Sequence, residues 1–188
     1  MRTIVTSLLT LEPQAGAHAE EMFEVLSDPA IYTFENAPPE SADWLRARFV
    51  RLESRQSSDG AEHWLNWVIR LPSGELIGYV QATIHADRSA GIAYELSSRN
   101  WGKGLGAHAV RTMLSELNGT YAVTRFCAVA KAANFRSIRM LERLGFTLAS
   151  PDEGLRHAIE PDEVLLLRDA RVPERAAVDR AQTAERRF

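Results

Sequence analysis

The sequence predicts an α/β fold, in which a mixed β-sheet of about seven strands is flanked by about four helices. Three observations support this class. Residues 64–96 hold three strand-like runs joined by short turns, which is typical of an antiparallel meander. After residue 103 the hydrophobic period alternates between helix and strand, and such helical crossovers connect parallel strands. The length of 188 residues fits a single domain with a sizeable core.

The N-terminal third should contain one strand and two helices. β-branched and apolar residues over 3–11 predict a strand that Pro13 ends. Residues 15–27 carry apolar side chains at helical spacing, with glutamates between them. Ser41 fits the N-cap of a second helix, whose apolar residues fall on one face, and residues 57–60 form a loop.

In the rest of the chain, segments with the hydrophobic period of a strand alternate with segments that have the period of a helix. The meander is followed by a helix from residue 103 that the Asn118-Gly119 pair should close. A strand, a helix and two short strands come next. The predicted ranges are 64–71, 75–85 and 91–96 for the meander, 103–117 and 134–144 for the helices, and 123–129, 146–148 and 163–167 for the later strands.

Composition excludes several classes of protein. A net charge of −3 and a pI of about 6.0 argue against a nucleic-acid binder, which needs a basic excess. The sequence shows neither the pattern of a signal peptide nor an apolar run of roughly 18 residues, so we expect neither a signal peptide nor a membrane span. Cys127 is the single cysteine, and the five histidines lack ligand spacing, so we expect no disulfide, no metal site and a cytoplasmic protein. We expect one domain over 1–169, followed by an Ala/Arg-rich tail or short helix over 170–188.

The most informative segment is Trp101-Gly102-Lys103-Gly104-Leu105-Gly106, between a predicted strand and a helix. Glycines leave backbone N–H groups free to converge, and the helix adds the positive end of its dipole, an arrangement that suits a pyrophosphate. The segment lacks the pattern of a Walker A loop. A dinucleotide-binding turn would fit Gly102, Gly104 and Ala107, but the acid expected about 20 residues later is missing. A plain Gly-rich turn also stays open.

This segment resembles the acyl-CoA pyrophosphate loop of the GNAT superfamily of N-acetyltransferases, whose pattern is [QR]xxGx[GA]. Arg99-x-x-Gly102-x-Gly104 matches it literally, but the distance from the strand favours a register that starts at Trp101, where Trp replaces Gln or Arg. A second motif, Asn134-x-x-Ser137-x-x-x-Leu141-Glu142-x-x-Gly145-Phe146, resembles the later helix of the family. The N-terminal part, with Leu26-Ser27-Asp28-Pro29, is similar to the subgroup that modifies ribosomal-protein N-termini. The resemblance covers residues 3–168.

The resemblance implies acetyl-CoA as co-substrate, direct acetyl transfer to a primary amine and a centrally splayed sheet. It implies that residues 101–106 hold the pyrophosphate and that pantetheine lies between the third meander strand and the strand of Cys127, near Leu96 and Ser97. A backbone N–H there would polarise the thioester. Asn134 is similar to a cofactor-contacting residue and is also a fitting helix N-cap. Many relatives protonate the leaving thiolate with a Tyr at the position of Leu141; here Ser137, on the same face, is the candidate acid or an ordinary hydroxyl.

A general base is harder to identify. Strand alternation places Ile92, Tyr94 and Leu96 on one face of the third meander strand and Ala93 and Glu95 on the other. Glu95 could relay a proton from the acceptor or be a solvated carboxylate; the alternatives are Glu153 and Glu160. By analogy, residues 32–39 form the acceptor wall.

The acceptor is expected to be a protein N-terminus or a small molecule, bound by a monomer or homodimer without nucleic acid or membrane. A non-catalytic CoA-binding module and a nicotinamide-dependent oxidoreductase are the rival interpretations.

Overall fold

A computed structural model of the protein describes residues 1–34 and 37–170. The predicted C-terminal tail lies outside the described residues from 171 onward. Within the described chain no helix is both long and apolar enough to cross a membrane.

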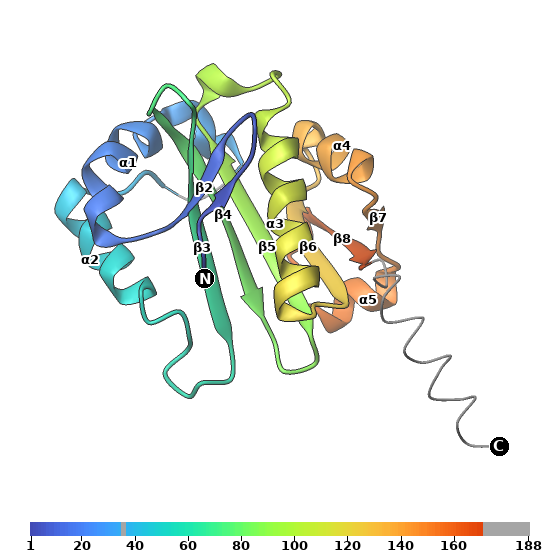
Figure 1. Ribbon diagram of the computed structural model, residues 1–188. Helices are drawn as coiled ribbons and strands as arrows, with labels where there is room; N and C mark the ends of the chain where they lie inside the picture. The colour runs from blue at the N-terminus through green and yellow to red at the C-terminus, as the bar shows by residue number, and fades with distance from the viewer. Residues whose placement is uncertain (35–36, 171–188) are drawn as a thin grey trace.

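The described chain forms one mixed sheet with the strand order β1-β2-β3-β4-β5-β6-β8-β7 (Figure 1). Every neighbouring pair is antiparallel except β5 and β6, which run parallel. The strands are β1 (Ile4–Val5), β2 (Thr10–Pro13), β3 (His63–Arg70), β4 (Leu76–Ile84), β5 (Ser89–Leu96), β6 (Arg125–Lys131), β7 (Thr147–Leu148) and β8 (Glu163–Asp169). The predicted α/β class, with a meander in a mixed sheet, is confirmed; the sheet has eight strands where about seven were predicted.

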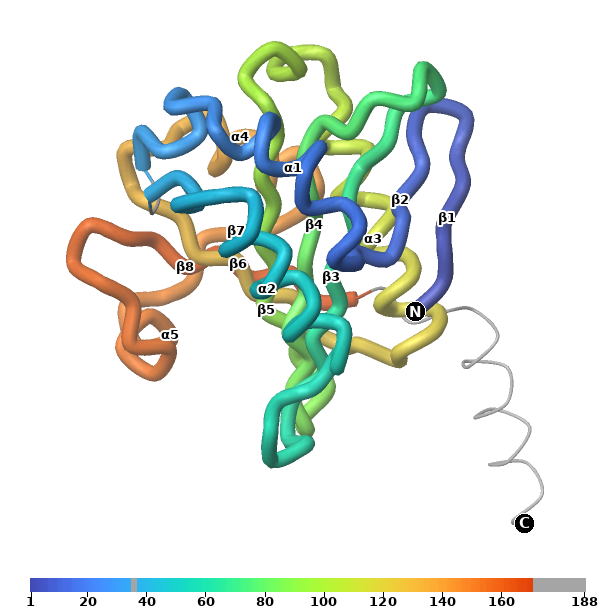
Figure 2. The backbone as a smooth tube through the Cα atoms, turned by 90° about the vertical axis from the view of Figure 1, so that its left-hand side faces the viewer, coloured from blue at the N-terminus to red at the C-terminus, as the bar shows by residue number. Residues whose placement is uncertain are grey.

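Helices cover both faces of the sheet, and each face has its own apolar core. The helices are α1 (Ala19–Leu26), α2 (Ala42–Leu52), α3 (Leu105–Tyr121), α4 (Phe135–Arg143) and α5 (Pro151–Arg156), with short 3-10 turns at Gly16–His18, Pro29–Thr33 and Ser98–Asn100. In Figure 1, α1 and α2 lie to the left of β3 and β4, and α3 lies to their right. Figure 2 looks onto the sheet from the side that α1 and α2 cover. The smaller core lies under α1 and α2, and the larger one under α3 and α4.

The structure corrects three details of the sequence-based elements. The predicted first strand is two strands, because Thr6 closes a turn by donating its hydroxyl to the Leu9 carbonyl. Helix α3 continues past Asn118-Gly119 to Tyr121, and Ala122, at φ 54°, ends it. Asn118 instead donates its side-chain amide to the Val123 carbonyl. Helix α5 was not predicted; a capping box between Ser150 and Glu153 begins it.

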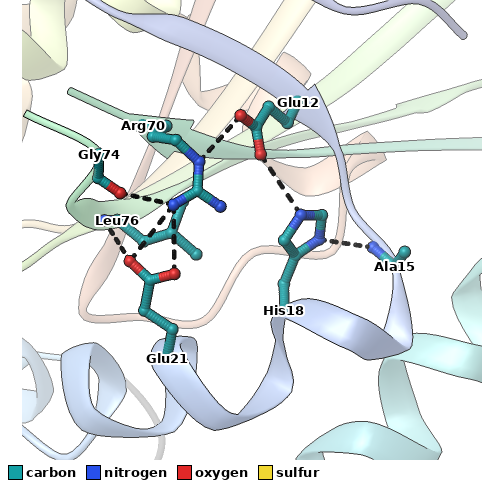
Figure 3. Close-up of polar contacts among 7 residues, drawn as sticks. All are labelled: Glu12, Ala15, His18, Glu21, Arg70, Gly74 and Leu76. Carbon is teal, nitrogen blue, oxygen red and sulfur yellow. Dashed lines mark hydrogen bonds and ion pairs between the residues drawn. The ribbon is translucent and has the colours of Figure 1, made fainter. Parts of the chain in front are cut away.

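An ion-pair network connects the first helix to the sheet (Figure 3). Arg70, on β3, donates to Glu12 on β2 at 2.8 Å and to Glu21 on α1 at 3.2 Å. Glu21 also accepts the Leu76 amide at the start of β4, and the His18 ring lies 3.4 Å from Glu12. The two carboxylates raise the pKa of the Arg70 guanidinium. Because the Arg70 side chain is only 26% exposed, this network fixes the position of α1 on the sheet.

Candidate acyl-CoA site

A gap opens between β5 and β6, at the one parallel junction of the sheet. The two strands pair only at Ser89–Arg125, Ala90–Phe126 and Gly91–Cys127, although both continue for several residues beyond. The rest of β5 remains paired with β4 up to Leu96, and the rest of β6 remains paired with β8. Within the described chain, the carboxyl-terminal half of β5 therefore pairs with β4 on one edge and with no second strand on the other.

The register of β5 on β4 decides which backbone groups face this gap. The Ser97 amide donates to the Ile77 carbonyl at 2.9 Å, so the odd-numbered residues at this end of β5 bond to β4. The backbone groups of Tyr94 and Leu96 consequently point toward the gap. Of the two N–H groups near which the thioester was predicted to lie, that of Ser97 is already bonded to β4. The Leu96 N–H is therefore the candidate for polarising the thioester.

The glycine-rich loop lies directly after the carboxyl-terminal half of β5. Gly102 and Gly104 have φ values of 73° and 78°, in the left-handed region that favours glycine, and a Cβ on either would meet no atom within 4 Å. The backbone N–H groups of residues 102–107 make no hydrogen bond to another group of the described chain. These donors, at the start of α3, face open space and fit a bound pyrophosphate.

Gly106 has a different role from the two glycines before it. A Cβ there would lie 3.5 Å from the Met140 sulfur and 3.7 Å from Leu96. These are ordinary van der Waals distances, so Gly106 lies in packing contact with α4 and the end of β5 without requiring the absence of a Cβ. Lys103 reaches back toward the Asn100 side chain, at 3.5 Å, and Leu105 packs against the larger core.

Trp101, which stands at the first position of the loop motif, has two contacts that hold the loop. Its indole N–H donates to the Leu96 carbonyl at 2.8 Å. The guanidinium of Arg136, from the first turn of α4, lies 3.4 Å from the centre of its ring. This cation–π contact joins the loop to α4 across the mouth of the gap.

Helix α4 turns its first residues toward the same gap. Asn134 caps the helix by accepting the Ser137 amide at 3.2 Å, so its predicted capping role is observed. The Ser137 hydroxyl lies 2.7 Å from the Tyr94 hydroxyl of β5. Leu141, one turn later, is buried at 1% exposure in the larger core. Ser137 is therefore the polar side chain that this face of α4 brings to the gap.

Glu95 lies on the opposite face of β5, as strand alternation predicted. It is directly across from Tyr79 of β4. Burial first, and then the charge and hydrogen bond of Glu95, raise the pKa of Tyr79. Burial and the Glu95 charge also raise the pKa of Tyr32 to about 12, and the Tyr32 hydroxyl donates to the Leu26 carbonyl. Both phenols thus stay protonated around Glu95.

The alternative bases have other structural roles. Glu153 accepts the Ser150 amide at 3.0 Å in the capping box of α5, which holds its pKa below the usual range. Glu160 lies in the turn before β8, where its amide donates to Glu163. Residues 35–36 of the predicted acceptor wall lie outside the described residues. On the Glu95 face, the exposed Ala93 and Val129 leave the surface of β5 and β6 open to an acceptor.

Other groups near the gap do not suggest different chemistry. Burial raises the pKa of the Cys127 thiol, which disfavours the thiolate that a nucleophile needs. No group of three or more potential metal ligands is found in the described part of the chain. A cavity of about 480 Å³ lies between α3, the end of α4 and β8, lined in part by Arg111, Arg143 and Arg168, away from the gap.

Comparison with known proteins agrees with this geometry. Residues 9–147 match the acetyltransferase (GNAT) domain family, and this match includes the splayed strands, the loop and α4. The chain belongs to this family. The GNAT assignment made from the two sequence motifs is thereby confirmed.

The GNAT relatives include proteins of the predicted subgroup. A curated relative, an uncharacterized N-acetyltransferase p20 from Bacillus licheniformis, is 26% identical over 149 residues, which are 78% of this chain and 83% of that protein. RimL, a ribosomal L7/L12 α-N-protein acetyltransferase solved with coenzyme A, has a TM-score of 0.72 at 16% identity over 88% of this chain and 96% of its own. A ribosomal-protein-S5-alanine acetyltransferase from Vibrio fischeri has a TM-score of 0.72 at 15% identity, over 89% and 96%. These two structures share the fold.

Sequence reasoning missed two residues that the structure brings to the GNAT site. The alternation of β5 placed Tyr94 on the correct face, but nothing in the sequence indicated that its hydroxyl reaches Ser137. Arg136 stands inside the second motif without being one of its marked positions. Both contacts join residues 35 or more positions apart, so only the folded chain shows them.

Proposed function

We propose that the protein is an acetyl-CoA-dependent N-acetyltransferase that moves the acetyl group directly to a primary amine of a protein N-terminus or a small molecule. One observation carries this proposal. Pairing of β5 with β6 stops after Gly91–Cys127, so the rest of β5 leads, without a second strand beside it, into a loop whose N–H groups bond to no group of the described chain. This arrangement supports an extended pantetheine that pairs with β5 and a pyrophosphate at the start of α3.

The chain's own groups then take separate roles. The amides of residues 102–107 hold the phosphates, and the Leu96 N–H polarises the thioester carbonyl, which favours the oxyanion that forms during transfer. Asn134 orders the first turn of α4 and so positions Ser137 toward the leaving sulfur. Acetyl-CoA supplies the activated acyl group.

On the acceptor side, Glu95 is the proposed base. Its carboxylate lies among Tyr79 and Tyr32 on the face that is open at Ala93 and Val129. A water between the amine and Glu95 completes the path for the proton. Direct transfer needs no enzyme nucleophile, and this agrees with a Cys127 thiol whose pKa is raised.

The experiment is an acceptor screen with mass detection of the acetylated product. Peptides with a free N-terminus are compared with the same peptides blocked at the α-amine but carrying a free lysine, alongside small amines. If only the peptides with a free N-terminus gain an acetyl group, the acceptor is an α-amine. If only the small amines gain an acetyl group, the acceptor is a small molecule.

The rival function is a non-catalytic CoA-binding module, and the observation behind it is the buried Leu141 where many relatives carry a Tyr. Calorimetric binding of acetyl-CoA without thiol release on any acceptor would support the module and refute catalysis. Absence of both binding and turnover would refute the acyl-CoA site itself.

A further inference from the structure

The hydroxyl pair of Tyr94 and Ser137 lies where the proposed reaction needs a proton. Tyr94 is on β5, three residues beyond the last pair with β6, and Ser137 is in the first turn of α4. Their oxygens are 2.7 Å apart, and either one could be the donor. This contact joins the start of α4 to the part of β5 that does not pair with β6, beside which the proposed pantetheine runs.

A serine hydroxyl alone is a poor acid, because the alkoxide left behind is far more basic than a thiolate. A phenol with an ordinary pKa near 10 is much closer to a thiol, whose pKa is about 8.5. If the Tyr94 hydroxyl donates to the Ser137 oxygen, the Ser137 proton is free to point at sulfur, and the serine never has to become an alkoxide.

We propose, on the basis of the function proposed above, that Tyr94 is a positioning residue that orients the Ser137 hydroxyl and replaces its proton as the thiolate leaves. The position that carries a phenol in many relatives, Leu141, is apolar and buried here. Here a phenol comes instead from β5, where the Tyr94 hydroxyl contacts Ser137 of α4.

The step balances in atoms and electrons. The acceptor nitrogen forms a bond to the acetyl carbon, and the carbon–sulfur bond breaks with its electron pair on sulfur. The Ser137 proton moves to sulfur while the Tyr94 proton moves to the Ser137 oxygen. Glu95 takes up, through the bridging water, the proton that the amine loses and later releases it to solvent. The tyrosinate regains a proton from solvent.

The first test is a double-mutant cycle with Tyr94→Phe and Ser137→Ala, each removing one hydroxyl. We expect each single variant to lower kcat about tenfold to a hundredfold with little change in KM for acetyl-CoA. The double variant should be no slower than the worse single one, because both hydroxyls serve one proton path. Tyr121→Phe is the matched control, since Tyr121 is half-buried against the same core at the far end of α3.

The second test does not depend on turnover. Coenzyme A is bound, and its thiol is titrated by the ultraviolet absorbance of the thiolate. A hydroxyl that donates to the thiolate favours the charged form, so wild-type protein should lower the pKa of the bound thiol by about one unit. Tyr94→Phe should lose most of this shift, whereas Tyr121→Phe should keep it.

The outcomes separate this inference from the proposed function. Wild-type kcat and an unchanged thiol pKa in a folded Tyr94→Phe variant would overturn the role of Tyr94 while acetyl transfer stands. A lowered melting temperature with unaltered kcat would reduce the pair to a structural contact. If wild-type protein acetylates no amine, the proposed function fails, and the thiol titration still decides whether the pair donates to sulfur.

Discussion

Substitution of Gly104 by alanine tests the acyl-CoA loop most directly, because the structure separates its two effects. Gly104 has a φ of 78°, and a Cβ built on it would meet no atom within 4 Å. Alanine at that position therefore costs stability through the backbone alone, by about 1–2 kcal/mol. The same Cβ projects into the space beside the N–H groups that should contact phosphate.

The loss of affinity follows from those contacts. A hydrogen bond to a charged group contributes about 1.5–3 kcal/mol, so displacing one such contact should weaken acetyl-CoA binding by about tenfold to a hundredfold. Isothermal titration calorimetry measures this, and thermal denaturation measures the backbone cost. We expect kcat at saturating acetyl-CoA to fall less than affinity, since the loop acts on binding.

Gly60→Ala is the matched control for this substitution. Gly60 has a φ of 72° in a loop far along the chain from the site, and its Cβ would also meet nothing within 4 Å. Both variants should lose similar stability, but only Gly104→Ala should lose affinity. Equal stability losses with wild-type affinity in both would refute the assignment of the loop.

Three further substitutions test other contacts. Arg136→Met removes the cation on Trp101, an exposed contact worth about 0.5–1 kcal/mol, and should weaken acetyl-CoA binding about twofold to fivefold by calorimetry. Arg139→Met, at an exposed neighbouring position, should leave binding unchanged. Gly78→Ala places a Cβ against the Glu95 carbonyl oxygen and should lower the free energy of unfolding by about 3 kcal/mol in urea denaturation. Gly91→Ala, with open space around its Cβ, should leave that free energy nearly unchanged, and equal losses in the two variants would argue against the Gly78 contact. Arg70→Met breaks the network in Figure 3 and should lower Tm by about 4–8 °C without changing the affinity for acetyl-CoA. Arg46→Met is the control: its ion pair with Glu20 is exposed, so Tm should fall by at most about 2–4 °C.

The sequence alone determined the class of the fold and the position of the loop, because both depend on local signals. Hydrophobic periods of two and of 3.6 residues distinguish strands from helices, and glycines at 102 and 104 mark a backbone that needs positive φ. The element boundaries were less predictable. Asn118-Gly119 looks like a helix end, yet α3 continues to Tyr121, whose side chain packs against the larger core.

Only the tertiary structure decided how the site is assembled. Strand alternation shows that Tyr94 and Glu95 face opposite ways, but the partners of each come from elements distant in the sequence. Ser137 is 43 residues from Tyr94, and Tyr79 meets Glu95 through the register of β4 on β5. Such contacts depend on where β5 leaves β6, and a local pattern contains no information on that separation. The loop can therefore be recognised from the sequence, whereas the Tyr94–Ser137 contact, on which the proposed proton path depends, exists only in the folded chain.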